Sequence, residues 1–245
     1  MDNKKIALVT GATSGIGEAI ARRLAQERHT VVLTGRNAKR LQTMEREMAK
    51  RGQRVVAIAG DLTREQEAQK VVAEALRTFG AVDVLVHSAG IFRVTRLEDS
   101  STEEFRSVMD TNLTSLFFLS RALLPHFTKQ GGGHIVAVSS VAARKGFPGE
   151  TAYCASKWGL MGFLAALREE VRERGIRVTA LLPGPTATHA WEPLRGKAAL
   201  PLDKMMSAEM VAEAALAAID QPAIACVEEI LIAPTRDPFG GRAKD

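Results

Sequence analysis

The sequence IALVTGATSGIG at residues 6–17 decides the fold of this chain. Its first five residues are apolar and partly β-branched, which is typical of a short buried strand. Three glycines follow, and a helical pattern of apolar residues begins at Ile16. A strand, a glycine-rich turn and a helix in this order are typical of a site that binds a dinucleotide.

Each glycine in this stretch has its own role in such a site. Gly11 and Gly15 permit a tight turn and a close approach of the backbone, and Gly17 lets the helix pack against the strand. The free N–H groups at the start of the helix attract a pyrophosphate. We therefore expect the turn to contact a dinucleotide through Gly11, Thr13, Ser14, Gly15, Ile16 and Gly17.

The next strand ends in a basic residue where an acidic one would favour NAD(H). Residues 30–34 form an apolar run, followed by Gly35 and Arg36. A carboxylate at this point would bind both ribose hydroxyls and repel a 2′-phosphate, whereas Arg36 can pair with a phosphate. The sequence thus predicts NADP(H), with NAD(H) still possible. The competing interpretation is a solvated basic helix start, with Lys39 and Arg40 close behind.

A second motif places a phenol beside an ammonium group. Tyr153, the only tyrosine, lies four residues before Lys157, so the two share one face of a predicted helix. An adjacent ammonium lowers the pKa of a phenol, which then exchanges a proton with an alcohol or a carbonyl oxygen. The preceding apolar strand ends in Ser139 and Ser140, and a hydroxyl there can hold a carbonyl oxygen. The alternative is an ordinary pair on a helix surface.

Together these residues resemble the short-chain dehydrogenase/reductase family over essentially the whole chain. Thr10 to Gly17 match its Thr-Gly-x-x-x-Gly-x-Gly motif, and Tyr153 and Lys157 match its Tyr-x-x-x-Lys motif. The resemblance implies that Ser140, thirteen positions before the tyrosine, is the active-site serine. It also implies a catalytic role for Asn112.

The resemblance implies further contacts to the cofactor. They are Asp61 and Leu62 after the third strand, Ala89 and Gly90 after the fourth, Pro183, Gly184, Thr186 and Thr188 after the sixth, and Tyr153 and Lys157 themselves. One segment departs from the family, which usually has two asparagines where this chain has His87 and Ser88. His87 is then either a hydrogen-bonded histidine at a strand end or a titrating group near the cofactor.

Apolar strands alternate with amphipathic helices along the chain. Strands are predicted near residues 5–10, 30–35, 54–59, 83–87, 133–139, 176–182 and 227–233, and helices at 15–27, 38–51, 64–79, 101–129, 151–174 and 207–220. This alternation predicts an α/β protein with a three-layer, doubly wound Rossmann fold, a seven-stranded parallel sheet with helices on both faces. We expect a single domain over residues 1–245, with a substrate lid at about 187–206.

Composition excludes several other classes of function. The net charge is +5, but the basic residues are dispersed among glutamates, which argues against a nucleic-acid partner. No stretch approaches the roughly 18 apolar residues of a membrane span. The first residues run directly into a strand, so we expect no signal peptide. Cys154 and Cys226 lack metal-ligand spacing, which predicts no metal site and a reducing, cytoplasmic location.

The family resemblance implies interconversion of a small-molecule carbonyl compound and its alcohol, with Tyr153 as general acid or base. Lys157 would lower the pKa of Tyr153, Ser140 would hold the carbonyl, and Asn112 would hold a water of the proton relay. One alternative is a reductase of 3-oxoacyl chains on an acidic carrier protein, and another is a non-catalytic nucleotide sensor. The resemblance also implies a homotetramer or homodimer.

Overall fold

The computed structural model describes residues 4–194 and 200–240, and these form one seven-stranded sheet. Every neighbouring pair of strands is parallel, in the order β3-β2-β1-β4-β5-β6-β7. The strands are β1 (Ile6–Thr10), β2 (Thr30–Gly35), β3 (Val55–Ala59), β4 (Val84–His87), β5 (Gly133–Val138), β6 (Ile176–Pro183) and β7 (Glu229–Ile232). The predicted parallel sheet is confirmed.

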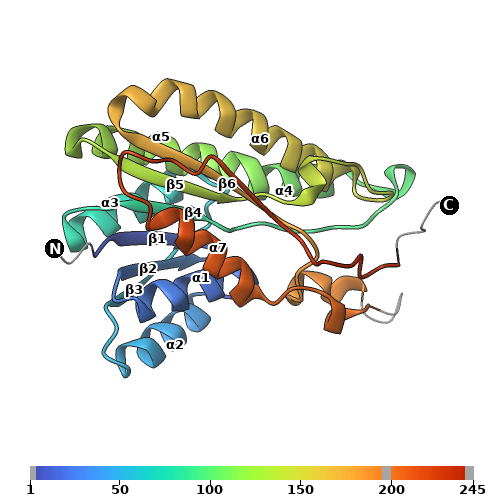
Figure 1. Ribbon diagram of the computed structural model, residues 1–245, viewed down its shortest axis with the longest axis horizontal. Coiled ribbons are helices and arrows are strands. Elements are labelled where there is room, and N and C mark those ends of the chain that lie inside the picture. Colours follow the sequence, from blue (N-terminus) through green and yellow to red (C-terminus); the bar gives the residue numbers. More distant parts are fainter. Residues whose placement is uncertain (1–3, 195–199, 241–245) are drawn as a thin grey trace.

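Helices cover both faces of this sheet (Figure 1). One face packs against α1 (Gly15–Gln26), α2 (Ala38–Ala49) and α7 (Ala208–Ile219). The other packs against α3 (Glu65–Phe79), α5 (Ser115–Gln130) and α6 (Thr151–Val171). Alternate residues of each strand enter the two apolar cores, because successive side chains point to opposite faces of a strand. The three-layer architecture is therefore also confirmed.

The predicted helix over residues 101–129 is interrupted. It consists of α4 (Thr102–Met109), a π-helical turn at Asp110–Thr114 and then α5. The wider turn contains Asn112, whose side chain is completely buried and hydrogen-bonded to two other segments. π-Helical turns of this kind occur mostly within α-helices at functional sites. The other predicted elements differ from the structure only at their ends.

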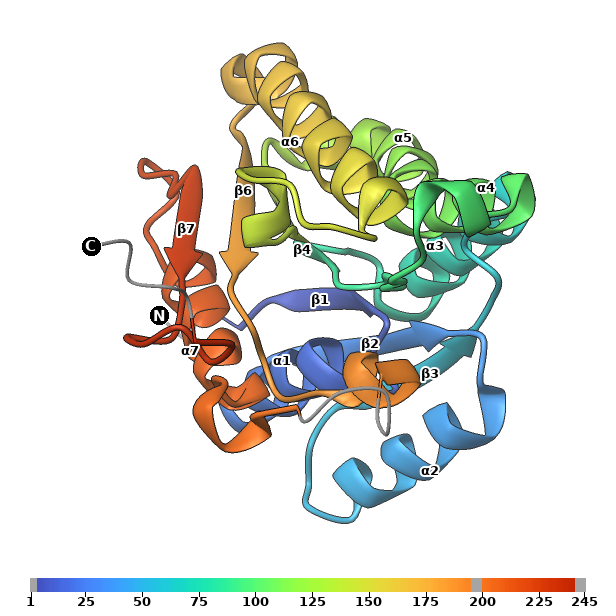
Figure 2. The same ribbon diagram turned by 90° about the vertical axis from the view of Figure 1, so that its right-hand side faces the viewer.

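The predicted lid follows β6. Its two ends are joined, because Ala187 N donates to Met206 O (2.8 Å) and Met206 N donates to Pro185 O (3.1 Å). Between them lie two short 3₁₀ turns, His189–Leu194 and Leu202–Lys204, while residues 195–199 fall outside the described residues. Figure 2 shows this segment, in orange, on the same side of the sheet as α1. No helix among the described residues has the length and apolar character needed to cross a membrane.

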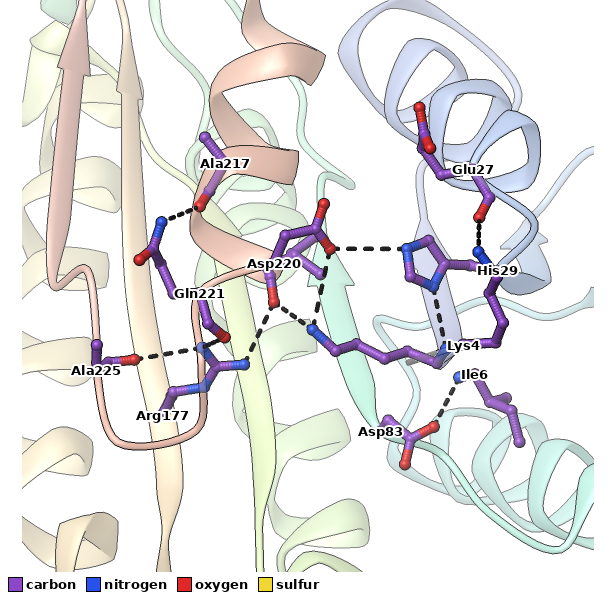
Figure 3. Close-up of polar contacts among 12 residues, drawn as sticks. Lys4, Ile6, Glu27, His29, Asp83, Arg177, Ala217, Asp220, Gln221 and Ala225 are labelled. Carbon is purple, nitrogen blue, oxygen red and sulfur yellow. Dashed lines mark hydrogen bonds and ion pairs between the residues drawn. The ribbon is translucent and has the colours of Figure 1, made fainter. Parts of the chain in front are cut away.

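The amino-terminal ends of several strands are held by a polar cluster (Figure 3). His29 Nδ1 accepts a hydrogen bond from Lys5 N (3.0 Å), and His29 Nε2 lies 3.7 Å from Asp220 Oδ1. Arg177 donates to the carbonyl oxygens of Gln221 (3.0 Å) and Ala225 (3.3 Å). The cluster joins the starts of β1, β2 and β6 to the end of α7, at the opposite end of the strands from the predicted site.

Two further histidines, His87 and His134, are buried, and their surroundings resemble each other. His87 Nε2 lies 2.8 Å from Ser115 Oγ, which donates to a backbone carbonyl, and His134 Nε2 lies 2.8 Å from Thr179 Oγ1, which does likewise. Each hydroxyl therefore accepts from Nε2–H, which leaves Nδ1 unprotonated and, within the described part of the chain, without a hydrogen-bond partner. Burial lowers the pKa of both histidines to about 3, so both are neutral at pH 7.

We expect stability to fall as the pH drops below about 6.5, the usual histidine pKa. An unfolded histidine takes up a proton there, whereas buried His87 and His134 do not until about pH 3. Between these two pH values, each histidine lowers the free energy of unfolding by up to about 1.4 kcal/mol for every pH unit of the drop. Urea unfolding at pH 7 and pH 5 measures the effect. His134→Gln should flatten the pH dependence, and exposed His189→Gln should not; equal slopes in both variants would contradict the assignment.

Candidate active site

The glycine-rich turn lies between β1 and α1 and has no room for a side chain at Gly11 or Gly17. Gly11 has a φ of +62°, and a Cβ atom there would lie 2.8 Å from the backbone N of Ala89. A Cβ atom on Gly17 would collide with the carbonyl oxygen of Gly11. The turn thus presents bare backbone at the start of α1, which fits a pyrophosphate. Thr13, Ser14, Gly15 and Ile16 belong to the same turn and the first residues of the helix.

The departure at His87 and Ser88 does not loosen the end of β4. Thr10 Oγ1 accepts hydrogen bonds from the backbone N atoms of Ser88 (3.1 Å) and Ala89 (2.9 Å). This brace uses the Thr10 hydroxyl and the main-chain amides of Ser88 and Ala89, so it does not require the two asparagines usual in the family. The His87 side chain points instead to Ser115, and the nearby Lys157 charge adds to the burial that lowers the pKa of His87.

Ser140 and Tyr153 come together at the carboxyl end of β5. Ser140 begins a 3₁₀ turn, and its Oγ accepts from Ala142 N (3.1 Å). The same side chain lowers the pKa of Tyr153, which lies in the first turn of α6. Ser139 is buried, and its Oγ has no hydrogen-bond partner among the described residues. The geometry therefore favours Ser140 over Ser139 as the serine beside the phenol.

Lys157 lies one helical turn beyond Tyr153 but is not hydrogen-bonded to it. Its Nζ donates to Val138 O (2.9 Å) and lies 5.6 Å from the centroid of the Tyr153 ring. Burial lowers the pKa of Lys157 to about 8. Burial also raises the pKa of Tyr153 to about 12, and the hydrogen bond from Ser140 opposes this rise. Desolvation is the largest of these effects on the phenol, and the lowering of its pKa by Lys157 stays a prediction.

Asn112 connects three segments around this pair. Its Oδ1 accepts from Ile91 N (2.8 Å), and its Nδ2 donates to Ile91 O (3.1 Å) and to Ser156 Oγ (2.9 Å). Ser156 in turn donates to Tyr153 O (2.7 Å). Both amide protons of Asn112 are thus used in holding the loop after β4 against α6. The predicted water would have to bind another atom of this residue.

Gly90 is the point where these groups meet. A Cβ atom there would lie 3.4 Å from Asn112 Oδ1 and 3.8 Å from Lys157 Nζ. Ser156 was not among the predicted site residues. Its place directly before Lys157, on the buried face of the same helix, is the sequence signal that could have identified it.

At the far end of the predicted cofactor site, Arg36 is exposed after β2 and has no ion pair among the described residues. Arg40 differs, because its Nη2 pairs with Glu18 Oε1 at 2.9 Å. Asp61 Oδ1 accepts from Thr63 Oγ1 (2.7 Å), and Leu62 is buried. Arg36 and Asp61 follow the paired strands β2 and β3 but have no described contact with the Tyr153 group.

The segment after β6 joins the glycine turn to the lid. Thr186 Oγ1 donates to Gly184 O (2.9 Å), next to Pro183 at the end of the strand. A Cβ atom on Gly15 would lie 3.3 Å from Thr188 Cβ. A cavity of about 360 Å³ opens here between α1 and the lid, lined by Gly15, Glu18, Ala19, Arg22, Ala187, Thr188, His189, Glu192, Leu202, Ala208 and Glu209. It does not include the Tyr153 group.

A row of aromatic rings covers Tyr153. Phe92, in the loop after β4, packs edge-on against Tyr153 with 4.9 Å between ring centroids. Trp191 of the lid lies 5.2 Å from Phe92 and donates from Nε1 to Thr186 O (2.9 Å). Phe239, near the end of the described chain, lies 5.5 Å from Trp191. The lid predicted over residues 187–206 includes Trp191, but the sequence analysis did not predict the row of rings, Phe92 or Phe239.

No group of three or more histidine, cysteine, aspartate or glutamate side chains within residues 4–194 and 200–240 is placed to hold a metal ion. The site is built instead from backbone amides, one phenol, one ammonium and a serine hydroxyl. These groups can hold and protonate an oxygen atom, and they can bind a phosphate.

Comparisons with known proteins agree with this geometry. A family model described as short chain dehydrogenase matches residues 5–199. An uncharacterized oxidoreductase of Staphylococcus haemolyticus is 33% identical over 232 residues, which cover 95% of this chain and 98% of that protein.

Solved structures of the same type superpose closely. An alcohol dehydrogenase from Thermococcus sibiricus, complexed with 5-hydroxy-NADP, has a TM-score of 0.88 at 28% identity and covers 96% of this chain and 98% of its own. A variant of actinorhodin polyketide ketoreductase with NADPH has a TM-score of 0.87 at 29% identity and covers 96% of this chain and 97% of its own. With the family model spanning most of its length, the chain belongs to the short-chain dehydrogenase family of oxidoreductases.

Proposed function

We propose that this protein is an NADP(H)-dependent oxidoreductase that interconverts a small-molecule carbonyl compound and its alcohol, with Tyr153 as general acid and base. The observation that carries the proposal is the position of the half-buried Tyr153 phenol, with the Ser140 side chain acting on it and Lys157 Nζ 5.6 Å from the centroid of its ring. Structural neighbours whose descriptions name NADP or NADPH support it.

Residues of this chain hold the oxygen of the substrate and exchange a proton with it. Ser140 donates a hydrogen bond to the carbonyl oxygen and holds it beside the Tyr153 hydroxyl. Tyr153 transfers its proton to that oxygen during reduction and takes it back during alcohol oxidation. Because burial raises the pKa of Tyr153 to about 12, the phenol carries its proton at neutral pH and is ready to donate. Lys157, with a pKa of about 8, then stabilises the phenolate that donation leaves.

The bare backbone of the glycine turn supports binding of a dinucleotide. In the proposal, the turn from Gly11 to Gly17 holds the pyrophosphate and Arg36 holds the 2′-phosphate. Asp61 and Leu62 border the adenine, and the nicotinamide half is held by Ala89, Gly90, Tyr153, Lys157, Pro183, Gly184, Thr186 and Thr188. When bound, the cofactor supplies or accepts the hydride. Asn112 has a positioning role, because its hydrogen bonds fix the loop after β4 against α6.

Carbonyl reduction, followed through the consumption of NADPH, tests this function. Wild-type protein should reduce members of a panel of aliphatic and aromatic ketones and aldehydes with NADPH and prefer it to NADH. Arg36→Ala should raise the KM for NADPH about 10- to 100-fold, because a hydrogen bond to a charged group contributes about 1.5–3 kcal/mol. The KM for NADH, which lacks the 2′-phosphate, should change little.

Arg40→Ala is the matched control for this experiment. Arg40 is only four residues away, but its guanidinium is held in an ion pair with Glu18, which also pairs with Arg22. Its loss should therefore change the ratio of the two KM values far less than the loss of Arg36. An NADH preference in the wild type would contradict the cofactor assignment. Binding of NADPH without turnover of any substrate in the panel would favour the sensor alternative, and binding of neither nucleotide by folded protein would contradict both.

The carrier-protein alternative receives little support from the charges near the site. Arg144 pairs with Glu229, Arg96 lies 3.4 Å from Glu98, and Lys145 lies over the Phe147 ring. A docking rim would need cations that are available to the partner. Because a polyketide ketoreductase is among the structural neighbours, the panel of carbonyl compounds also includes a 3-oxoacyl chain on a carrier protein as a second substrate class.

We also propose a homotetramer or homodimer in a reducing, cytoplasmic compartment. Phe117 on α5 and Trp158 on α6 expose 42% and 54% of their surface, which leaves apolar area on these two helices that a second subunit can cover. Cys154 and Cys226 are both free thiols, as expected where disulfides do not form.

A further inference from the structure

His87 is a buried histidine to which the proposed reaction assigns no role. It is the last residue of β4, it exposes 1% of its surface, and it stands where the family usually has an asparagine. Its ring is directed at the start of α5, because His87 Nε2 lies 2.8 Å from Ser115 Oγ. A histidine in this place either titrates near the cofactor or holds a neighbouring segment, and its contacts distinguish the two roles.

The residue that His87 contacts closes the π-helical turn at Asp110–Thr114. Ser115 N donates to Asp110 O, five residues back, as a π-helical turn requires. In an α-helix the same N–H group would bond to Thr111 O, four residues back. Here the side chain bonds to that carbonyl instead, since Ser115 Oγ donates to Thr111 O (2.7 Å). The hydroxyl therefore stabilises the wider turn in place of an α-helical one.

His87 fixes this hydroxyl in the orientation that the turn needs. The single proton of Ser115 Oγ is given to Thr111 O, so the oxygen accepts from His87 Nε2–H. Burial lowers the pKa of His87 to about 3, so the ring stays neutral and keeps this arrangement at neutral pH. The contacts thus favour a residue that holds a segment over one that titrates.

The turn held in this way carries Asn112. Its Oδ1 accepts from Ile91 N (2.8 Å), and its Nδ2 donates to Ser156 Oγ (2.9 Å). A Cβ atom on Gly90 would lie 3.4 Å from Asn112 Oδ1 and 3.8 Å from Lys157 Nζ. If the turn returned to α-helical register, Asn112 would point in another direction and both of its partners would lose a hydrogen bond.

We propose that His87 is a positioning residue of the reaction, which acts through Ser115 to hold the π-helical turn that directs Asn112 at the loop after β4. The inference rests on the proposed function, because Gly90 and Lys157 beside this loop would hold the nicotinamide half of the cofactor. A misplacement of about 1 Å can lower a rate about 100-fold even when the altered residue does not touch the substrate.

Hydrogen exchange at the backbone amide of Ile91, followed by NMR, tests the positioning without cofactor or turnover. This N–H group donates to Asn112 Oδ1, so its exchange rate reports whether Asn112 keeps its place. His87→Leu removes the N–H donor and should speed this exchange about 10-fold, the loss expected for one hydrogen bond. The amide of Ala89 is the reference in the same loop, because it donates to Thr10 Oγ1 and not to Asn112.

Turnover of the same variants tests the effect on the reaction. His87→Leu should lower kcat for carbonyl reduction about 10- to 100-fold. NADPH affinity should stay within a few-fold, because the proposed phosphate contacts lie at the glycine turn and Arg36. His87→Gln places an amide N–H near the position of Nε2 and should restore most of kcat, with a pH profile of wild-type shape, since glutamine cannot titrate.

His134→Leu is the matched control. His134 is equally buried and also donates from Nε2, to Thr179 Oγ1 at 2.8 Å, but it lies at the start of β5, away from Tyr153. Its loss should lower the free energy of unfolding about as much as the loss of His87. It should leave kcat and the exchange of the Ile91 amide close to wild type.

Ser115→Ala tests the route of the effect and serves as a second variant should His87→Leu not fold. It should speed exchange at Ile91 and lower kcat at least as much as His87→Leu. The double variant should lose no more than Ser115→Ala alone, because His87 acts through that hydroxyl.

Three results would overturn the inference: unchanged exchange at Ile91 in His87→Leu or Ser115→Ala, equal losses of kcat in His87→Leu and His134→Leu, or no recovery in His87→Gln. The proposed function is judged separately. If the wild type reduces no carbonyl compound of the panel, that function is wrong, whereas exchange at Ile91 still shows whether His87 holds Asn112.

Discussion

Tyr153→Phe is expected to lower kcat for carbonyl reduction by about 10²- to 10⁴-fold, the usual contribution of a positioned proton donor. The substitution removes only the hydroxyl whose pKa the Ser140 side chain lowers. It keeps the ring, so the packing against Phe92 at 4.9 Å should persist. No other tyrosine exists in the chain to donate the proton instead.

Two measurements distinguish lost chemistry from lost structure in this variant. NADPH affinity, followed by energy transfer from Trp191, should stay within a few-fold of the wild type, and the melting temperature should change little. Thr151→Ala removes a hydroxyl from an exposed position two residues away and should retain nearly full kcat. Unchanged turnover in Tyr153→Phe would rule out the proposed mechanism.

Much of this architecture is predictable because local patterns and the fold agree. The apolar run at residues 6–10, the glycines that follow it and the alternation of strands and helices each specify the same doubly wound sheet. The spacing of Ser140, Tyr153 and Lys157 also predicts their proximity, because the end of a parallel strand and the start of the next helix are necessarily close.

Other features depend on contacts between distant segments and cannot be read from a local pattern. The π-helical turn at Asp110–Thr114 exists because Asn112 bonds to Ile91 and Ser156, which lie 21 and 44 residues away. Likewise, Arg40 appears in the sequence as a free cation beside Arg36 but pairs with Glu18 on another helix.

The pKa values of the site residues also cannot be read from a local sequence pattern. Sequence spacing predicts that Lys157 lowers the pKa of Tyr153, because the two are one turn apart. The outcome depends on burial, which raises the pKa of the phenol and lowers that of the ammonium. Desolvation is a property of the packed molecule, so no motif reports it.

Gly17→Ala is expected to be the most damaging single-methyl substitution in the cofactor site. The added Cβ atom would collide with the Gly11 carbonyl oxygen, so α1 must move away from the turn. Overpacking of this type costs about 1–3 kcal/mol of stability. NADPH affinity should fall by at least about 10-fold for each hydrogen bond from the helix start to the pyrophosphate that is lost.

Gly162→Ala is the matched control, since it adds the same methyl group where a Cβ atom would meet nothing within 4 Å. This glycine lies inside α6, where alanine favours the helix by up to about 1 kcal/mol, so the control should be as stable as the wild type or more so. Urea unfolding and NADPH titration of both variants give the comparison. If Gly17→Ala keeps wild-type affinity, the start of α1 does not bind the pyrophosphate, because a shift of that helix must displace its N–H groups.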